Sequence, residues 1–115
     1  MINLQRLKMA IEGIDLVDDK LEIYLKENEL ESYTEYNAGS NSNKKMIVKT
    51  ALSILEDIAN NPQLMREYKT DDMTISQFSE NIRIRIDNLE KKIRLMADDN
   101  QVYQDGASFC YMFSQ

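Results

Sequence analysis

Histidine is absent from this chain of 115 residues, and cysteine occurs once, as Cys110. Histidine is the commonest general base and the commonest transition-metal ligand in proteins. Its absence excludes Ser-His-Asp and Cys-His catalytic devices, and one cysteine without histidine does not suffice for a structural zinc site. A lone cysteine cannot form an internal disulfide either, which indicates a reducing, intracellular origin. We therefore expect no enzymatic activity, no metal and no cofactor.

Glycine and proline are almost as scarce, at three and one residues. Few tight turns favour long helices over a β-sandwich or barrel. The apolar share of 43% is close to that of globular proteins, and the length suffices for one modest core. No apolar run approaches the roughly 18 residues that span a bilayer, and the N-terminus lacks the continuous apolar core of a signal peptide. The composition predicts one all-α domain with no membrane partner.

Positive charge is also in deficit, because the net charge is −6. A negative chain is a poor general binder of nucleic acid phosphates, and we expect no sequence-specific nucleic acid partner. The cations in residues 83–94 are interleaved with acids and lie on several faces, as on a solvated helix surface. Five aspartates precede or open predicted helices: Asp15, Asp18, Asp19, Asp71 and Asp72. Acids at such positions are explained by capping and helix-dipole chemistry, more simply than by a carboxylate site.

Apolar spacing predicts two short helices in the first thirty residues. The first carries Leu4, Leu7, Ile11 and Ile14 on one face. We expect Asn3 to cap its start and Gly13 to end it. The second should begin near Asp15, with Val17, Leu21, Tyr24 and Leu25 on its inner face. Residues 31–43 are polar and are expected to form a loop that few side chains can anchor.

The second half of the chain predicts longer helices. One should start at Ser42 or Asn43 and run to about Asn60, with a stripe of Ile47, Ala51, Ile54, Leu55 and Ile58. Asn61-Pro62 predicts a cap and a short helix through Tyr68. Thr74 and Gln77 form a capping box before a last helix of roughly 35 Å. Its apolar stripe is Ile75, Phe78, Ile82, Ile86, Leu89, Ile93 and Met96. The prediction is a bundle of four main helices over residues 1–98, in which this long last helix is the spine.

The tail, residues 99–115, differs from the rest in pattern. After Gly106, residues alternate, so that Phe109, Tyr111 and Phe113 share one face. A period of two with aromatics predicts an extended segment that can form a β-strand. Its backbone groups would need a partner, and we therefore assign these three aromatics to an interface. A disordered tail is the alternative, and Cys110 is interpreted as a small packing residue.

Three lysines open the third predicted helix: Lys44, Lys45 and Lys49. They lie at the positive end of its dipole, which costs up to about 0.3–1 kcal/mol for each exposed charge. Surface charge without a function is the simpler interpretation. An acidic partner, or local pairing with Glu31 and Glu35, would offset the cost, and we assign the lysines to an interface as a hypothesis.

The order of elements resembles the small helical head–tail connector proteins of tailed bacteriophages, also called head-completion or portal-adaptor proteins. The opening LQRLKMAIEGIDLVDDKLEIYLKENELESYTEY is similar to their start, and KKMIVKTALSILEDIANNP resembles their central helix. A long helix with a TISQF opening then precedes a Ser-Phe-Tyr tail. The likeness covers most of the chain and is one of pattern. A glycine-serine-rich stretch before the tail, common in that family, is not found here.

The resemblance implies a structural protein of the virion, assembled in the cytoplasm of a bacterial host. About a dozen copies would form a ring between the portal protein and the tail components, with no catalytic residues. An acidic chain suits a DNA conduit, which should not hold DNA tightly. The alternative function is a small cytosolic helical module that captures one partner, as an antitoxin or anti-repressor does.

Overall fold

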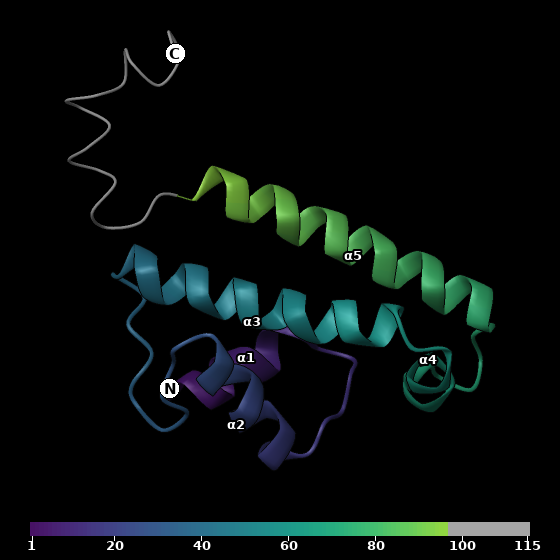
Figure 1. Cartoon of the computed structure of the whole chain (residues 1–115), viewed down its shortest axis with the longest axis horizontal. Coiled ribbons are helices and arrows are strands. Elements are labelled where there is room, and N and C mark those ends of the chain that lie inside the picture. The colour runs from purple at the N-terminus through teal and green to yellow at the C-terminus, as the bar shows by residue number, and fades with distance from the viewer. Residues whose placement is uncertain (97–115) are drawn as a thin grey trace, which may run out of the picture.

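The computed structural model describes residues 1–96, which form five α-helices (Figure 1). They are α1 (Asn3–Ala10), α2 (Asp18–Glu27), α3 (Asn41–Ala59), α4 (Pro62–Tyr68) and α5 (Ile75–Leu95). The predicted all-α fold with a long C-terminal helix is confirmed. Within these residues, no helix is long and apolar enough to cross a membrane. The predicted extended tail lies outside the described residues.

Helix α3 is the centre of the fold. It packs on each of the other four helices, with α1 and α2 on one side and antiparallel α5 on the other (Figure 1). Its seven buried residues are Ile47, Val48, Thr50, Ala51, Ile54, Leu55 and Ile58, and they include the whole predicted stripe. In α5, by contrast, only Phe78 and Ile82 are buried. The long last helix is therefore laid along a core that α3 provides.

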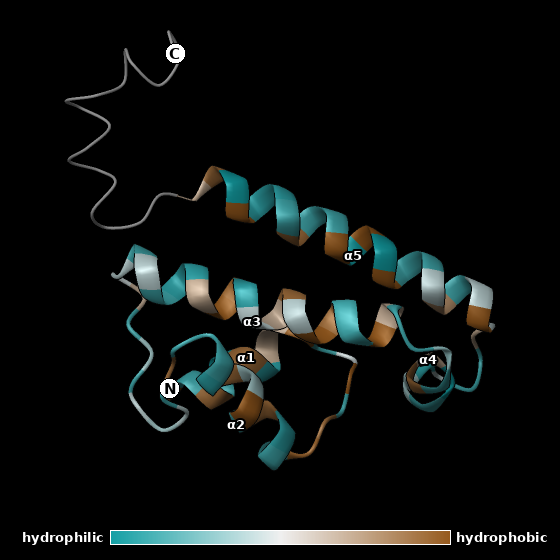
Figure 2. Ribbon diagram, in the orientation of Figure 1, coloured by the Kyte–Doolittle hydropathy of each residue, from teal (hydrophilic) through white to brown (hydrophobic). Residues whose placement is uncertain are grey.

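The middle of the apolar stripe of α5 packs against the core. Figure 2 shows hydrophobic residues recurring along the edge of α5 that faces α3, whereas the rest of the helix is mainly hydrophilic. Ile86 and Leu89 are half-buried against the core, and Ile75 is 37% exposed. Helix α5 packs on two helices, α3 and α4, whereas α3 packs on four, so the stripe of α5 is buried less deeply than that of α3.

Most predicted helix ends are confirmed. Thr74 and Gln77 form the reciprocal capping box, and Asn61 accepts hydrogen bonds at the start of α4. Gly13 follows α1 with φ +93°, a conformation that favours glycine. The predicted starts of α2 and α3 were each wrong by about two or three residues. Helix α3 is capped by Ser40, whose side chain accepts a hydrogen bond from the Asn43 amide.

Two predicted roles near the N-terminus were wrong. Val17 is not on the inner face of α2; it precedes the helix in an extended conformation and is 63% exposed. Asn3 does not cap α1 but lies inside it, almost fully buried. Its side-chain amide donates to the carbonyl oxygen of Glu31 at 2.8 Å. The Val17 error follows from the later start of α2, whereas the Asn3 error reflects a tertiary contact that outweighs local preference.

The loop between α2 and α3 is held firmly to the N-terminus, contrary to expectation. Carbonyl oxygens of Ser32 and Thr34 accept the first amides of α1, from Leu4 and Asn3, at 3.0 and 2.9 Å. The amide of Tyr36 donates to the carbonyl of Met1 at 2.8 Å. These backbone bonds satisfy donors that every helix start leaves open. The loop is anchored by backbone hydrogen bonds, which its polar side chains do not indicate.

Candidate interaction surfaces

The start of α3 and the end of α5 form one basic end of the molecule. The two helices are antiparallel, so residues 41–49 and 91–96 meet at the same end (Figure 1). These fifteen residues carry six cations and no acid: Lys44, Lys45, Lys49, Lys91, Lys92 and Arg94. The three on α5 are exposed and the three on α3 are half-buried. The fold therefore concentrates positive charge in a protein whose net charge is −6.

Glu31 and Glu35 have partners other than Lys44 and Lys49. Glu35 pairs instead with the N-terminal ammonium group at 2.7 Å, and Glu31 contributes its backbone carbonyl to Asn3. No ion pair within residues 1–96 joins Lys44 or Lys49 to either glutamate. The cost of Lys44 and Lys49 near the N-terminus of α3 is therefore not offset by ion pairs with Glu31 or Glu35.

Negative charge is concentrated on the other side of α3. Residues 12–31, which include α2, contain eight acids and two lysines. Helices α2 and α5 pack on α3 and not on each other. Asp18 pairs with Lys8 at 2.9 Å, and Glu22 accepts a hydrogen bond from the Tyr33 hydroxyl at 2.6 Å. That bond raises the pKa of Tyr33. We call residues 12–31 the acidic segment.

A mostly apolar groove of about 390 Å³ opens beside the first half of α5. Its walls come from the α1–α2 corner, the α4–α5 turn and α5: Gly13, Ile14, Thr70, Met73, Phe78, Asn81, Ile82, Ile84 and Arg85. All of these α5 residues lie in its first eleven positions, away from the basic end. The groove and the basic end are therefore at opposite ends of α5.

Arg85 fixes one wall of this groove. Its guanidinium group donates to the carbonyl oxygens of Ala10 and Glu12, both at 3.2 Å. These carbonyls belong to the C-terminal end of α1 and the turn after it, where a cation also complements the helix dipole. A residue assigned from sequence to a solvated surface thus joins α5 to α1.

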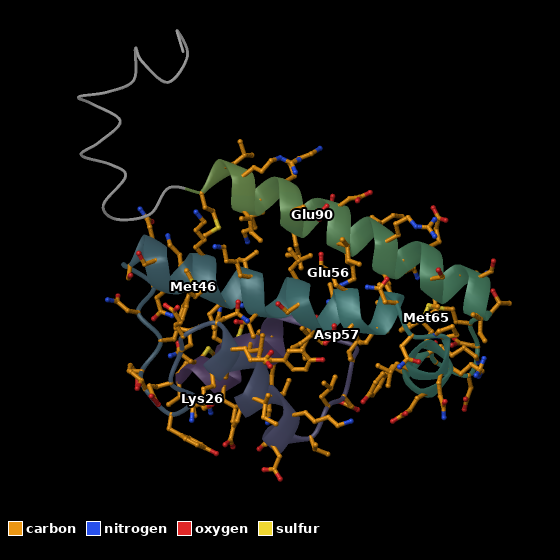
Figure 3. The ribbon with its side chains drawn as sticks, in the orientation of Figure 1. Lys26, Met46, Glu56, Asp57, Met65 and Glu90 are labelled. Atoms are coloured by element: carbon orange, nitrogen blue, oxygen red, sulfur yellow. The ribbon has the colours of Figure 1, made fainter. Side chains whose placement is uncertain are left out.

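The hydroxyl of Tyr24 donates a hydrogen bond of 2.6 Å to the carboxylate of Asp57, which joins α2 to α3. Figure 3 shows Asp57 on the side of α3 toward α2, whereas its neighbour Glu56 lies toward α5. Burial and then the Asp57 carboxylate raise the pKa of Tyr24. A neutral tyrosine that donates to a carboxylate has a structural role and is not poised for proton transfer.

Metal chemistry has no candidate within residues 1–96, because no group of three or more acidic, cysteine or histidine side chains is close enough there to hold an ion. Asp18 and Asp19 lie in the first turn of α2, as predicted. Asp71 and Asp72 lie in the turn between α4 and α5.

The structure brings only part of the predicted interface together. Lys44, Lys45 and Lys49 lie together at the basic end, next to cations of α5 that the sequence did not group with them. The start of one helix lies beside the end of another when the two helices are antiparallel. The packing of α3 and α5 therefore had to be known before these cations could be grouped. The aromatics Phe109, Tyr111 and Phe113, together with Cys110, lie outside the described residues. No family model matches the chain, and the comparisons with curated proteins and with solved structures found no match.

Proposed function

We propose that this chain is a structural adaptor of the head–tail connector kind, whose copies assemble head to tail into a ring. The observation that carries the proposal is the separation of charge. The basic end has six cations and no acid, and the acidic segment has eight acids against two lysines.

Such a distribution favours contact between unlike surfaces of two copies. A contact between two basic ends would be repulsive, and so would a contact between two acidic segments. A basic end against an acidic segment is attractive, and it leaves one surface of each copy open for the next. Heterologous contacts of this kind close into rings when the rotation between copies permits.

The proposed setting is a virion, with the ring between the portal protein and the tail components. The net charge of −6 suits a ring through which DNA passes, since it opposes tight binding of the phosphate backbone. The resemblance in element order to phage connectors supports this setting. The proposed work of the chain is assembly, with no catalytic residue and no cofactor.

Co-purification tests the proposed function. The tagged full-length chain is co-expressed with the portal protein encoded in the same genome. We expect capture of the portal in a complex that contains many copies of this chain. The control is a triple variant with the exposed cations Lys91, Lys92 and Arg94 changed to glutamate, which should reduce the number of copies bound. Capture of a single small partner at one-to-one stoichiometry, without the portal, would instead indicate a regulatory binding module.

A further inference from the structure

The groove beside α5 exposes apolar surface in a place that favours a side-chain occupant. Ile84 lines it yet keeps 49% of its surface exposed. Gly13 forms part of the wall, and nothing lies within 4 Å of the position that a Cβ atom would take there. Covering this surface would be favourable by the hydrophobic effect. The cavity volume of about 390 Å³ also lies in the range of pockets that enclose small ligands.

The polar groups of the groove indicate an uncharged occupant. The guanidinium group of Arg85 is already bonded to two carbonyl oxygens, of Ala10 and Glu12. The side-chain amide of Asn81 contacts the sulfur of Met73 at 3.7 Å. With its cation committed to α1, the groove is better suited to apolar side chains than to an anion.

A segment of this chain has that character. Residues 107–113, ASFCYMF, carry no charged side chain and place Phe109, Tyr111 and Phe113 on one face when extended. They lie outside the described residues. Within residues 1–96, the isolated bridge between Ile2 and Glu35 is the β-pairing present, so the described domain offers no strand for the segment to extend. The alternative to strand pairing is that its side chains dock into an apolar groove.

We propose that the aromatic face of residues 107–113 of one copy docks in this groove on the next copy. The inference rests on the proposed head-to-tail assembly. The groove wall at Gly13 and Ile14 belongs to the acidic segment, and the tail follows the basic end of α5. A contact between these two surfaces therefore puts the start of one tail beside the groove of its neighbour.

The length of the tail fits this path. Residues 97–108 can span about 40 Å when extended, at about 3.3 Å per residue. Helix α5, with 21 residues, is about 30 Å long. Residues 97–108 are therefore longer than α5 when extended, so a tail that starts at the neighbour's acidic segment is long enough to reach the groove, whose wall at Gly13 and Ile14 is part of that segment.

Paramagnetic broadening between two full-length chains tests the docking. One chain carries a nitroxide on Cys110, whose side chain points away from the aromatic face in an extended segment. The other is labelled with ¹⁵N and carries Cys110→Ser. In the mixture at low salt, we expect the amide signals of Gly13, Met73 and Asn81 to lose most of their intensity. Signals of Lys26 and Met46 should keep theirs.

A matched pair of variants in the ¹⁵N chain locates the effect. Ile84→Glu should abolish the broadening, whereas Met9→Glu should leave it unchanged, since Met9 is also exposed, at 57% against 49% for Ile84, but lies on α1 outside the groove and outside the acidic segment. Broadening seen only within a single doubly labelled chain, or broadening insensitive to Ile84→Glu, would overturn the inference. Chains that associate by light scattering without broadening the groove signals would overturn it too, while leaving the proposed assembly intact. Chains that do not associate would also overturn it, and co-purification with the portal judges the proposed function separately.

Discussion

Arg85 shows how one side chain can join distant parts of a small fold. Its two hydrogen bonds to the end of α1 link residues more than seventy positions apart. Replacing it with alanine leaves two carbonyl oxygens without these donors, and we expect a loss of about 1–2 kcal/mol in the free energy of unfolding. Arg85→Lys should recover only part of this loss. The lysine ammonium group can still donate to a carbonyl oxygen, but it lacks the planar fork with which the guanidinium group reaches both.

Arg83→Ala is the matched control in urea denaturation. Arg83 is two residues away, 68% exposed, and 3.8 Å from the Glu80 carboxylate. Exposed pairs contribute little, so this variant should lose less than about 0.5 kcal/mol. Equal losses in the two alanine variants would show that Arg85 does not hold α1 in solution.

Tyr24 should make the stability of the fold depend on pH in the alkaline range. Because its pKa is raised in the folded chain, first by burial and then by Asp57, the folded state favours the neutral phenol. The resulting stability is fully present below the ordinary tyrosine pKa of about 10 and is lost as the pH rises above it. Tyr24→Phe should cost about 1 kcal/mol near neutral pH by removing the hydrogen bond.

The free-energy difference between wild type and Tyr24→Phe should narrow above a pH of about 10 in urea melts. Tyr33→Phe is the comparison, because Tyr33 donates to Glu22 at the same distance of 2.6 Å but is 66% exposed. Its effect should be smaller at every pH. A Tyr24→Phe variant with wild-type stability at neutral pH and a parallel pH curve would contradict this account.

At the scale of the elements, residues of α5 that share one apolar stripe in the sequence differ in how deeply they are buried. Ile82 is 1% exposed and Ile86 is half-buried, although both belong to the stripe of α5. Ile82→Ala should cost about 2–5 kcal/mol, the range for fully buried isoleucine, and Ile86→Ala clearly less. Ile84→Ala, at an exposed position of the same helix, should cost under about 1 kcal/mol. Melts in which Ile86→Ala loses as much as Ile82→Ala would show that the core extends further along α5.

The sequence predicted the elements well where the signal is local. Capping at Thr74 and Asn61 depends on residues three positions apart or fewer, and the stripe of α3 depends on its own period. What it missed depends on contacts between distant segments. Asn3 was predicted to cap α1, but its side-chain amide binds the carbonyl oxygen of Glu31. The loop carbonyl oxygens that accept the first amides of α1 are backbone groups, so no residue type in the sequence indicates them. The interface assigned to the lysines at 44, 45 and 49 stays a prediction, and their position at the same end of the molecule as the cations of α5 depends on the antiparallel packing.

At the scale of the whole molecule, the antiparallel packing of α3 and α5 brings cations that are far apart in the sequence to one end of the molecule, away from the acidic segment. We call this separation the charge polarity of the molecule. Cations at the start of α3 and the end of α5 share one end, while residues 12–31, which include α2 on the other side of α3, contain eight acids (Figure 1). Salt at physiological concentration screens exposed charges over about 8 Å, so contacts of this kind should weaken steeply as salt is added. The proposed ring, and the docking of the tail in the groove, both depend on this polarity.

The most direct test is a complementation experiment with two full-length variants. The first reverses the basic end, with Lys91→Glu, Lys92→Glu and Arg94→Glu. The second reverses exposed acids of the acidic segment, with Asp15→Lys, Asp19→Lys and Glu27→Lys. Circular dichroism should show that both keep the helical content of the wild type.

Light scattering at low salt then measures the mass of each sample. Wild type should associate, each variant alone should be monomeric, and an equimolar mixture should associate again, because each reversed surface then meets one of opposite sign. Association of either variant alone to the extent of the wild type, or a mixture that stays monomeric, would contradict head-to-tail assembly through these surfaces.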